Sequence, residues 1–260
     1  MQAIYTPPVR YEFSRPQACF AYWQALAALG LTPTAPFLSV LVAHGGFECG
    51  NFAEGLWNCN PGNIKADLVG LHAPAWSGEF TCITVNEILE RDGQNIEVWF
   101  SPEGELVGRR GSALRYPALA VPPGHAQTRM RAFSSLAEGV TDKIKFLLGD
   151  HWKGALEFAK RGDAAGYVRS IRAGGYFTAY RGQPDPTPYE TSVVSLAHTY
   201  RPIVEAVGGS PVSTEPLSRV QADPLEAVRT DLIGDDLRAR IVAAQAPILD
   251  SILEEARKRT

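Results

Sequence analysis

One apolar run that ends at a single carboxylate constrains the fold more than any other feature. Thr34 suits the cap of a helix and Pro36 its first turn. Residues 37–42 (FLSVLV) are too apolar for a surface helix and predict a helix buried in the core. The last turn contains Gly45 and Gly46, each costing about 1 kcal/mol relative to alanine inside a helix. We therefore expect another group to pack very close to this turn.

This buried helix is expected to end at Glu48, which is a candidate proton donor. In a pocket walled by Phe47, Phe52 and Trp57, the charged carboxyl group would lose hydration, and its pKa would rise toward the value that an acid catalyst needs. The alternative is an ordinary solvent-facing glutamate, since a helix C-terminus disfavours a negative charge. The residue spacing alone leaves both interpretations open.

The remaining periodicity predicts an α+β fold. Apolar residues at helical spacing predict helices over residues 16–29, 135–148, 152–160, 163–172 and 188–204. Alternating Thr, Ile and Val predict strands over residues 80–89 and 96–100, which the turn at 91–93 would join, and a short run follows at 105–107. Helices, a small antiparallel sheet and further helices follow one another without an internal repeat.

Composition divides the chain into one domain and a tail. Residues 1–206 are expected to form the domain, beginning with an irregular arm at 1–12 and including an enlarged β-lobe at about 78–128, of which 108–128 look loop-like. Residues 207–223 are rich in Gly, Ser and Pro and predict a linker. Residues 224–260 predict a charged helical tail, which either docks a partner or folds back on the domain.

Charge and hydropathy exclude several classes of function. The chain has 260 residues and a formal net charge of −3, which argues against nucleic acid as the main partner. No run approaches the roughly 20 apolar residues that span a bilayer, and the first residues lack the order of a signal peptide. We therefore expect a protein made in the cytoplasm without membrane insertion.

The cysteines Cys19, Cys49, Cys59 and Cys82 form no CxxC pair and have no histidine at zinc-finger spacing, so no metal site is expected. Buried thiols are one interpretation of these residues. A disulfide between Cys49 and Cys59, closing the loop after Glu48, is the other, and it would require an oxidising destination.

Five short motifs occur in the order found in one known family. They read Phe-Glu-Cys-Gly at 47–50, Asn-Pro-Gly-Asn-Ile-Lys at 60–65, Thr-Val-Asn-Glu at 84–87, Met-Arg-Ala-Phe-Ser-Ser at 130–135, and Gly-Tyr-Phe-Thr at 175–178 followed by Pro-Tyr at 188–189. Over residues 14–206 the chain thereby resembles the peptidoglycan-cleaving N-acetylglucosaminidase domain of glycoside hydrolase family seventy-three, found in flagellar muramidases and autolysins.

The resemblance implies a lysozyme-like helical lobe and a β-hairpin lobe across a cleft, without cofactor or metal. It makes Glu48 the general acid, Glu87 the second carboxylate on the β-lobe, and Tyr176 the cleft tyrosine. The strand and turn themselves offer Glu90 and Asp92 as rivals of Glu87. Residues expected to bind substrate around them are Phe52, Trp57, Asn60, Asn63, Lys65, Thr178 and Tyr189.

Three departures from the family pattern bear on these roles. Cys49 stands for the usual Ser, Asn63 stands for the usual Gly, and the stretch at about 94–127 is longer than the family's hairpin. Because a longer lobe can bring another acid over the cleft, the last departure bears on Glu87 most directly.

The expected activity is hydrolysis of the β-1,4 glycosidic bond after N-acetylglucosamine in peptidoglycan strands. Water activated by Glu87, or the substrate's own acetamido group, would assist at the anomeric carbon. A lytic transglycosylase or muramidase with one glutamate, or a non-catalytic glycan-binding part of a phage tail or secretion apparatus, are the alternatives. Without a signal peptide, the protein would reach the cell wall through a phage or secretion system, with the C-terminal tail as a possible docking element.

Overall fold

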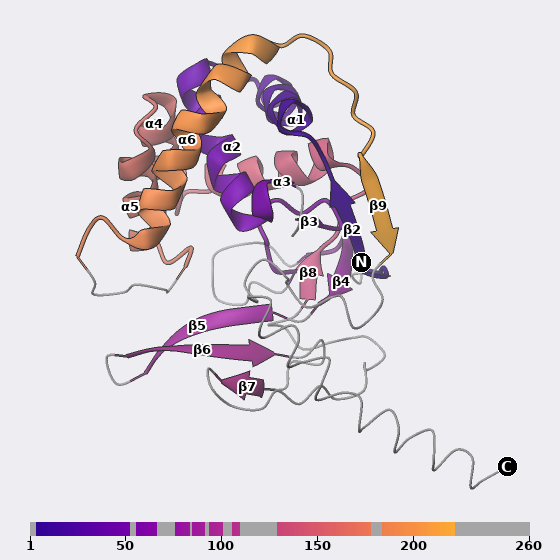
Figure 1. Cartoon of the computed structure of the whole chain (residues 1–260), viewed down its shortest axis with the longest axis vertical. Coiled ribbons are helices and arrows are strands. Elements are labelled where there is room, and N and C mark those ends of the chain that lie inside the picture. Colours follow the sequence, from indigo (N-terminus) through magenta and orange to yellow (C-terminus); the bar gives the residue numbers. More distant parts are fainter. Residues whose placement is uncertain are drawn as a thin grey trace, which may run out of the picture.

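The computed structural model describes residues 4–52, 56–66, 76–83, 85–91, 94–100, 106–109, 129–177 and 184–221. Within these residues the protein has a mixed α+β fold of helices and small three-stranded sheets (Figure 1). The helices are α1 (Arg15–Ala28), α2 (Ala35–Glu48), α3 (Leu136–Leu148), α4 (Lys153–Lys160), α5 (Ala164–Ala173) and α6 (Pro188–Val207), with a short 3₁₀ turn at Gly50–Phe52. The expected helices are therefore confirmed, with small differences at their ends.

Helix starts follow the capping residues in the sequence. The Thr34 hydroxyl accepts a hydrogen bond from the Phe37 amide at the start of α2. Ser135 and Thr187 cap α3 and α6 in the same way. The glutamates at the third positions of α3 and α6 bond to other groups: Glu138 accepts from the Ser134 amide, and Glu190 accepts from Arg169 on α5.

Helix α2 forms the centre of the helical body, as its apolar sequence predicts. It packs against α6, α1 and α4, and its residues from Phe37 to Gly46 are all buried. The close approach expected at its two glycines is made by tyrosine side chains. A Cβ on Gly45 would overlap the Tyr22 hydroxyl, and one on Gly46 would lie 3.0 Å from the Tyr200 hydroxyl.

In the described ranges, the strands form three sheets of three strands each. Their bounds are β1 (Ile4–Tyr5), β2 (Val9–Glu12), β3 (Leu56–Trp57), β4 (Glu79–Cys82), β5 (Val85–Arg91), β6 (Gln94–Phe100), β7 (Leu106–Arg109), β8 (Arg129–Arg131) and β9 (Ser218–Gln221). The sheet orders are β1-β4-β8, β3-β2-β9 and β5-β6-β7, and β1 with β4 is the parallel pair. The β5–β6 pair, in which Glu87 lies opposite Val98, confirms the expected hairpin.

Three expectations about the strands are corrected. The single strand expected at 80–89 divides into β4 and β5 of different sheets, because β4 pairs with β1 and β8. The arm at 1–12 contains β1 and β2 and is not irregular throughout. The stretch predicted as a linker contains β9, which pairs with β2 from Val9 to Glu12 and returns the chain to the domain.

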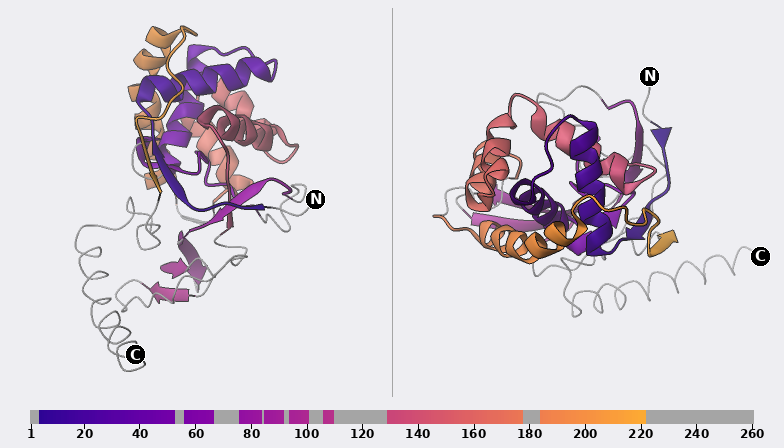
Figure 2. Two further views of the ribbon diagram at one scale, coloured as in Figure 1. Left: turned by 90° about the vertical axis from the view of Figure 1, so that its right-hand side faces the viewer. Right: turned by 90° about the horizontal axis from the view of Figure 1, so that it is seen from above.

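The β5-β6-β7 sheet lies at one end of the helical body in Figure 1 and in the left view of Figure 2. This is the end at which α2, with Glu48 as its last residue, finishes and at which α6 begins. The side chains of this sheet, and the residues 110–128 and 222–260 with their expected loop and tail, lie outside the described residues.

Two further expectations concern a disulfide and membrane insertion. Cys19, Cys49, Cys59 and Cys82 are all buried and reduced, and the Cys49 thiol donates to the Gly45 carbonyl oxygen at 2.9 Å. The thiol interpretation is confirmed, and the Cys49–Cys59 disulfide is not formed. In the described part of the chain, no helix is both long enough and apolar enough to cross a bilayer.

Candidate active site

Glu48 is the last residue of α2, and its side chain is 15% exposed. The Tyr189 hydroxyl, from the first turn of α6, donates to its Oε1. Asn63 Nδ2 donates to the main-chain oxygen of Glu48 and lies 3.4 Å from Oε2. The carboxyl group is therefore fixed from two elements and stays in partial contact with solvent.

His44 lies one turn before Glu48 on the same face of α2 and is fully buried. Its Nδ1 is 2.6 Å from the Tyr167 hydroxyl, and its Nε2 is 3.6 Å from Glu48 Oε1. When Tyr167 donates to Nδ1, the ring proton sits on Nε2 and faces the carboxylate. Burial, and then the charge of Lys143, lower the pKa of His44 to about 4, so this ring is neutral at pH 7.

Lys143 brings a second basic group to the site from α3. Its side chain is fully buried, and its Nζ donates to the Pro61 carbonyl oxygen at 3.3 Å. Burial lowers the pKa of Lys143 to about 8, and the charge of Glu48 acts in the opposite direction. Lys143 is therefore mostly protonated at pH 7.

The expected rise in the Glu48 pKa is wrong for this structure. Burial by itself raises that pKa, but the hydrogen bond and charge of His44, the charge of Lys143 and the bond from Tyr189 outweigh burial and lower the pKa to about 2. His44 and Lys143, the two basic groups that contribute to this lowering, were not predicted from the sequence. Glu48 is consequently ionised at neutral pH in the protein without a ligand.

The turn at residues 60–64 is held rigidly beside Glu48. Asn60 uses its side chain inside the turn, donating to the carbonyl oxygens of Ile64 and Arg131 and accepting from the Ile64 amide. The Tyr176 hydroxyl donates to the Gly62 carbonyl oxygen at 2.9 Å. Asn63 has φ of 47°, in the left-handed region that Gly and Asn tolerate best, which accounts for Asn where the family has Gly.

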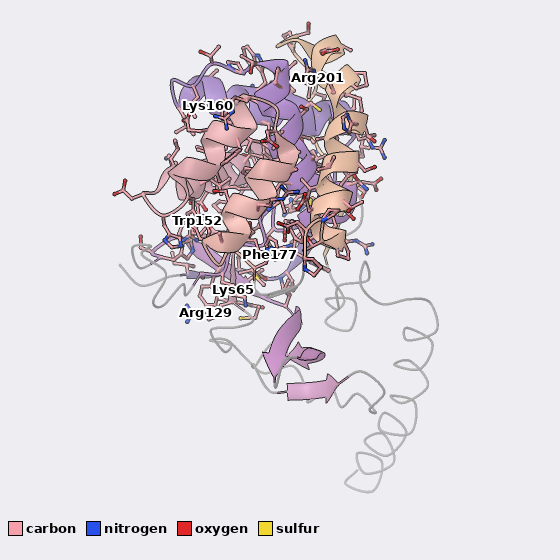
Figure 3. All side chains as sticks on the ribbon, turned by 90° about the vertical axis from the view of Figure 1, so that its left-hand side faces the viewer. Lys65, Arg129, Trp152, Lys160, Phe177 and Arg201 are labelled. Carbon is pink, nitrogen blue, oxygen red and sulfur yellow. The ribbon has the colours of Figure 1, made fainter. Side chains whose placement is uncertain are left out.

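Aromatic rings form one wall of the site. Tyr189 stacks on Phe177 with ring centroids 4.1 Å apart, and Phe47 meets Tyr189 edge-on at 4.4 Å. Figure 3 labels Phe177, Lys65 and Arg129 along the edge of the helical body that is nearest to the β5-β6-β7 sheet. This edge combines aromatic and basic side chains.

Several residues expected to contact a glycan do not have the surface to do so. Phe52 is fully buried between Tyr22 and Tyr200, and Trp57 is 3% exposed on β3. Asn60 is 2% exposed, and its bonds are within the protein. These three predictions are corrected: the side chains shape the loop after Glu48 from the inside, because the short strand β3 and the turn fold into the core.

The other expected residues divide into those near Glu48 and those without a described side chain. Asn63 and Tyr189 contact Glu48, whereas Tyr176 bonds Gly62 and packs edge-on against His44 at 5.0 Å. Lys65 is half-buried, and its main chain forms an isolated antiparallel β-bridge with Met130 of β8. The side chains of Glu87 and Glu90, and the residues Asp92 and Thr178, lie outside the described residues.

Sequence reasoning missed His44 and Lys143. The signal for His44 was available, because a residue four positions before Glu48 shares its helix face. Lys143 had no such signal: it lies 95 positions after Glu48, and the apolar face of α3 gave no reason to place a lysine inside it. No cluster of potential metal ligands occurs among the described side chains.

Replacing His44 with glutamine is expected to weaken the acid sensitivity of the fold. Because the pKa of His44 is lowered on folding, His44 is protonated in the unfolded chain but stays neutral in the folded chain between about pH 6.5 and 4. Stability is therefore lost as pH falls through this window, by roughly 3 kcal/mol if His44 acts alone. Urea unfolding at pH 6.5 and 4.5 measures the loss.

The control for this experiment is His198→Gln on the exposed side of α6, which should keep the wild-type pH dependence. Glutamine at position 44 can still accept from Tyr167 and donate toward Glu48, so the variant removes titration more than packing. An unchanged loss of stability in His44→Gln would show that another group carries the acid sensitivity.

Comparison of the chain with family models, with curated proteins and with solved structures finds no match.

Proposed function

We propose that the protein is a glycoside hydrolase that cleaves the β-1,4 bond after N-acetylglucosamine in peptidoglycan, with Glu48 as general acid. The observation that carries the proposal is the Glu48 carboxyl group itself, at a helix end, 15% exposed, and hydrogen-bonded by Asn63 and Tyr189, with His44 Nε2 3.6 Å from its Oε1. Such a pre-oriented carboxyl group beside an aromatic wall suits proton transfer to a glycosidic oxygen. The lysozyme-like arrangement, with the β5-β6-β7 sheet as the second lobe, is part of this proposal.

The low pKa of Glu48 adds a condition to this mechanism. An acid catalyst must carry the proton that it delivers, and Glu48 is ionised in the free protein. A glycan over the site would remove the remaining water from the carboxyl group, and that desolvation raises the pKa. Proton uptake by Glu48 is thus proposed to accompany substrate binding.

In the proposed reaction, Glu48 gives its proton to the bridging oxygen as the bond to the anomeric carbon breaks. Water then adds to that carbon, activated by Glu87 on β5 or preceded by attack of the substrate's acetamido oxygen. Glu87 stays a prediction. Analysis of the product anomer separates the two routes, because acetamido participation retains configuration and direct attack by water inverts it.

Two other functions follow from specific observations. Glu48 is the carboxylate in the described network, and chemistry with a single glutamate fits a lytic transglycosylase, which would leave anhydro ends in place of reducing ends. The low pKa of Glu48 also fits a non-catalytic glycan-binding protein, because an ionised carboxylate accepts hydrogen bonds from sugar hydroxyls.

The experiment that tests the proposal is clearing of a gel that contains purified peptidoglycan. The full chain should produce a cleared zone. Binding to the same peptidoglycan in a sedimentation assay, without clearing, would support the glycan-binding alternative and contradict a hydrolase.

Delivery to the cell wall by a phage or secretion system, with the C-terminal tail as docking element, is likewise proposed. A deletion that tests the tail should begin at residue 222, because removal of β9 would take a strand from β2. Retained clearing by the shortened chain, together with lost delivery, would support docking.

A further inference from the structure

A lysine at the buried position of Lys143 destabilises the fold unless a nearby negative charge compensates its ammonium group. It is in the middle of α3 with no exposed surface, and its hydrogen bond to the Pro61 oxygen is long at 3.3 Å. Its stem runs against the turn, since a Cβ on Gly62 would lie 3.2 Å from Lys143 Cδ. A buried ammonium group with one neutral acceptor needs a nearby negative charge as compensation.

Glu48 supplies a negative charge beside the same turn, because Asn63 donates to the main-chain oxygen of Glu48 and lies 3.4 Å from its Oε2. The charge of Glu48 opposes the effect of burial on the pKa of Lys143. The described titratable groups that act on Glu48 or contact its partners come from each packed element. They are Tyr22 of α1, His44 of α2, Cys49 directly after α2, Lys143 of α3, Tyr167 of α5, Tyr176 after α5 and Tyr189 of α6. Of these groups, Lys143 carries the positive charge at neutral pH, because burial keeps His44 neutral and raises the pKa of each tyrosine.

We propose that Lys143 is the positioning residue of the Glu48 site: its buried ammonium group pairs electrostatically with the Glu48 carboxylate and at the same time holds the turn at 60–64 through the Pro61 oxygen. The role in catalysis rests on the proposed function, whereas the pairing of the two charges does not. Lys143 itself touches no substrate in this account.

This arrangement links the position of the turn at 60–64 to the charge of Glu48. The same ammonium group fixes the turn that carries Asn63, and Asn63 in turn bonds Glu48. Loss of the charge on Lys143 should make Glu48 take up a proton more readily. Loss of the hydrogen bond alone should loosen the turn and leave the titration of Glu48 as it is.

The test is an NMR titration of the protein labelled at the glutamate side-chain carboxyl carbons, with the Glu48→Gln spectrum identifying the Glu48 signal. In the wild-type protein, that signal should show its main step well below pH 4.5 and a second, smaller step near pH 8, as Lys143 loses its proton. The wild-type protein thus provides one arm of the test without any change to the fold.

Two variants separate charge from hydrogen bonding. Lys143→Met removes both, and Lys143→Gln keeps a donor for Pro61 without the charge. In both variants the second step should disappear and the main midpoint should rise by at least about one pH unit. Lys145→Met, exposed on the same helix, should keep both wild-type steps.

A wild-type signal without a step near pH 8, or a main midpoint that is the same in Lys143→Gln as in the wild type, would overturn the proposal. The titration needs no glycan, so it can succeed where peptidoglycan cleavage fails and fail where cleavage succeeds. The two proposals are therefore tested separately.

Discussion

Glu48→Gln is expected to lower the rate of peptidoglycan cleavage by roughly 10²–10⁴-fold, because this is what proton transfer by a positioned carboxyl group contributes and glutamine has no proton to give. Glutamine has the size of glutamate and can still accept from Tyr189, so the fold should remain intact. Release of new sugar ends from purified peptidoglycan measures the rate, and thermal unfolding checks the fold.

The matched control is Glu157→Gln on α4, which removes an exposed carboxylate that pairs with Lys160. This variant should cleave at the wild-type rate, because exposed ion pairs contribute little and α4 lies outside the Glu48 network. A Glu48→Gln variant that keeps its rate within a few-fold of the wild type would remove Glu48 from the mechanism.

Gly139→Ala is expected to destabilise the fold by about 3 kcal/mol, through overpacking. Gly139 lies on α3, and a Cβ there would overlap the carbonyl oxygen of Cys59 and lie 3.0 Å from Phe133. The obstacle is backbone, which cannot rotate away as a side chain can. Because α3 also carries Lys143, the shift should disturb the turn beside Glu48 as well.

Gly154→Ala on α4 is the comparison, because no heavy atom lies within 4 Å of a Cβ at that position. There the substitution should be neutral or stabilise by roughly 0.5–1 kcal/mol, as alanine is the better helix former. Urea unfolding of both variants gives the difference. Equal stability of the two variants would mean that α3 can move away from the loop without cost.

The helices could be predicted from the sequence because the signals for them are local. The apolar run at 37–42, the caps Thr34 and Ser135, and Pro188 in the first turn of α6 each act within a few residues. The strands β1, β2 and β9 could not be predicted, since each is short and its order comes from partners far along the chain. The Gly, Ser and Pro content of residues 207–223 predicted a linker and not β9, because β9 is ordered by pairing with the distant strand β2.

Glu48 and two of the residues that contact it could be predicted from the sequence, whereas the groups packed around them could not. Glu48 and its neighbours Asn63 and Tyr189 followed from short motifs, and the structure brings them together. Phe52 and Trp57 were expected to face a ligand because they are aromatic, yet aromatic rings serve the core equally well. The lowered pKa of Glu48 depends on His44 and Lys143, and the charge of a lysine that is distant in the sequence leaves no local pattern.

Mass spectrometry of the fragments released from purified peptidoglycan tests the assignment of Glu48 as the general acid of a glucosaminidase, because it identifies both the bond that is cut and the new chain end. We expect fragments with reducing N-acetylglucosamine ends from the wild-type chain and about 10²–10⁴-fold slower release of them from Glu48→Gln. Anhydro-ended fragments would contradict hydrolysis and indicate a lytic transglycosylase. The same fragments in the same amounts from both proteins would contradict the role of Glu48.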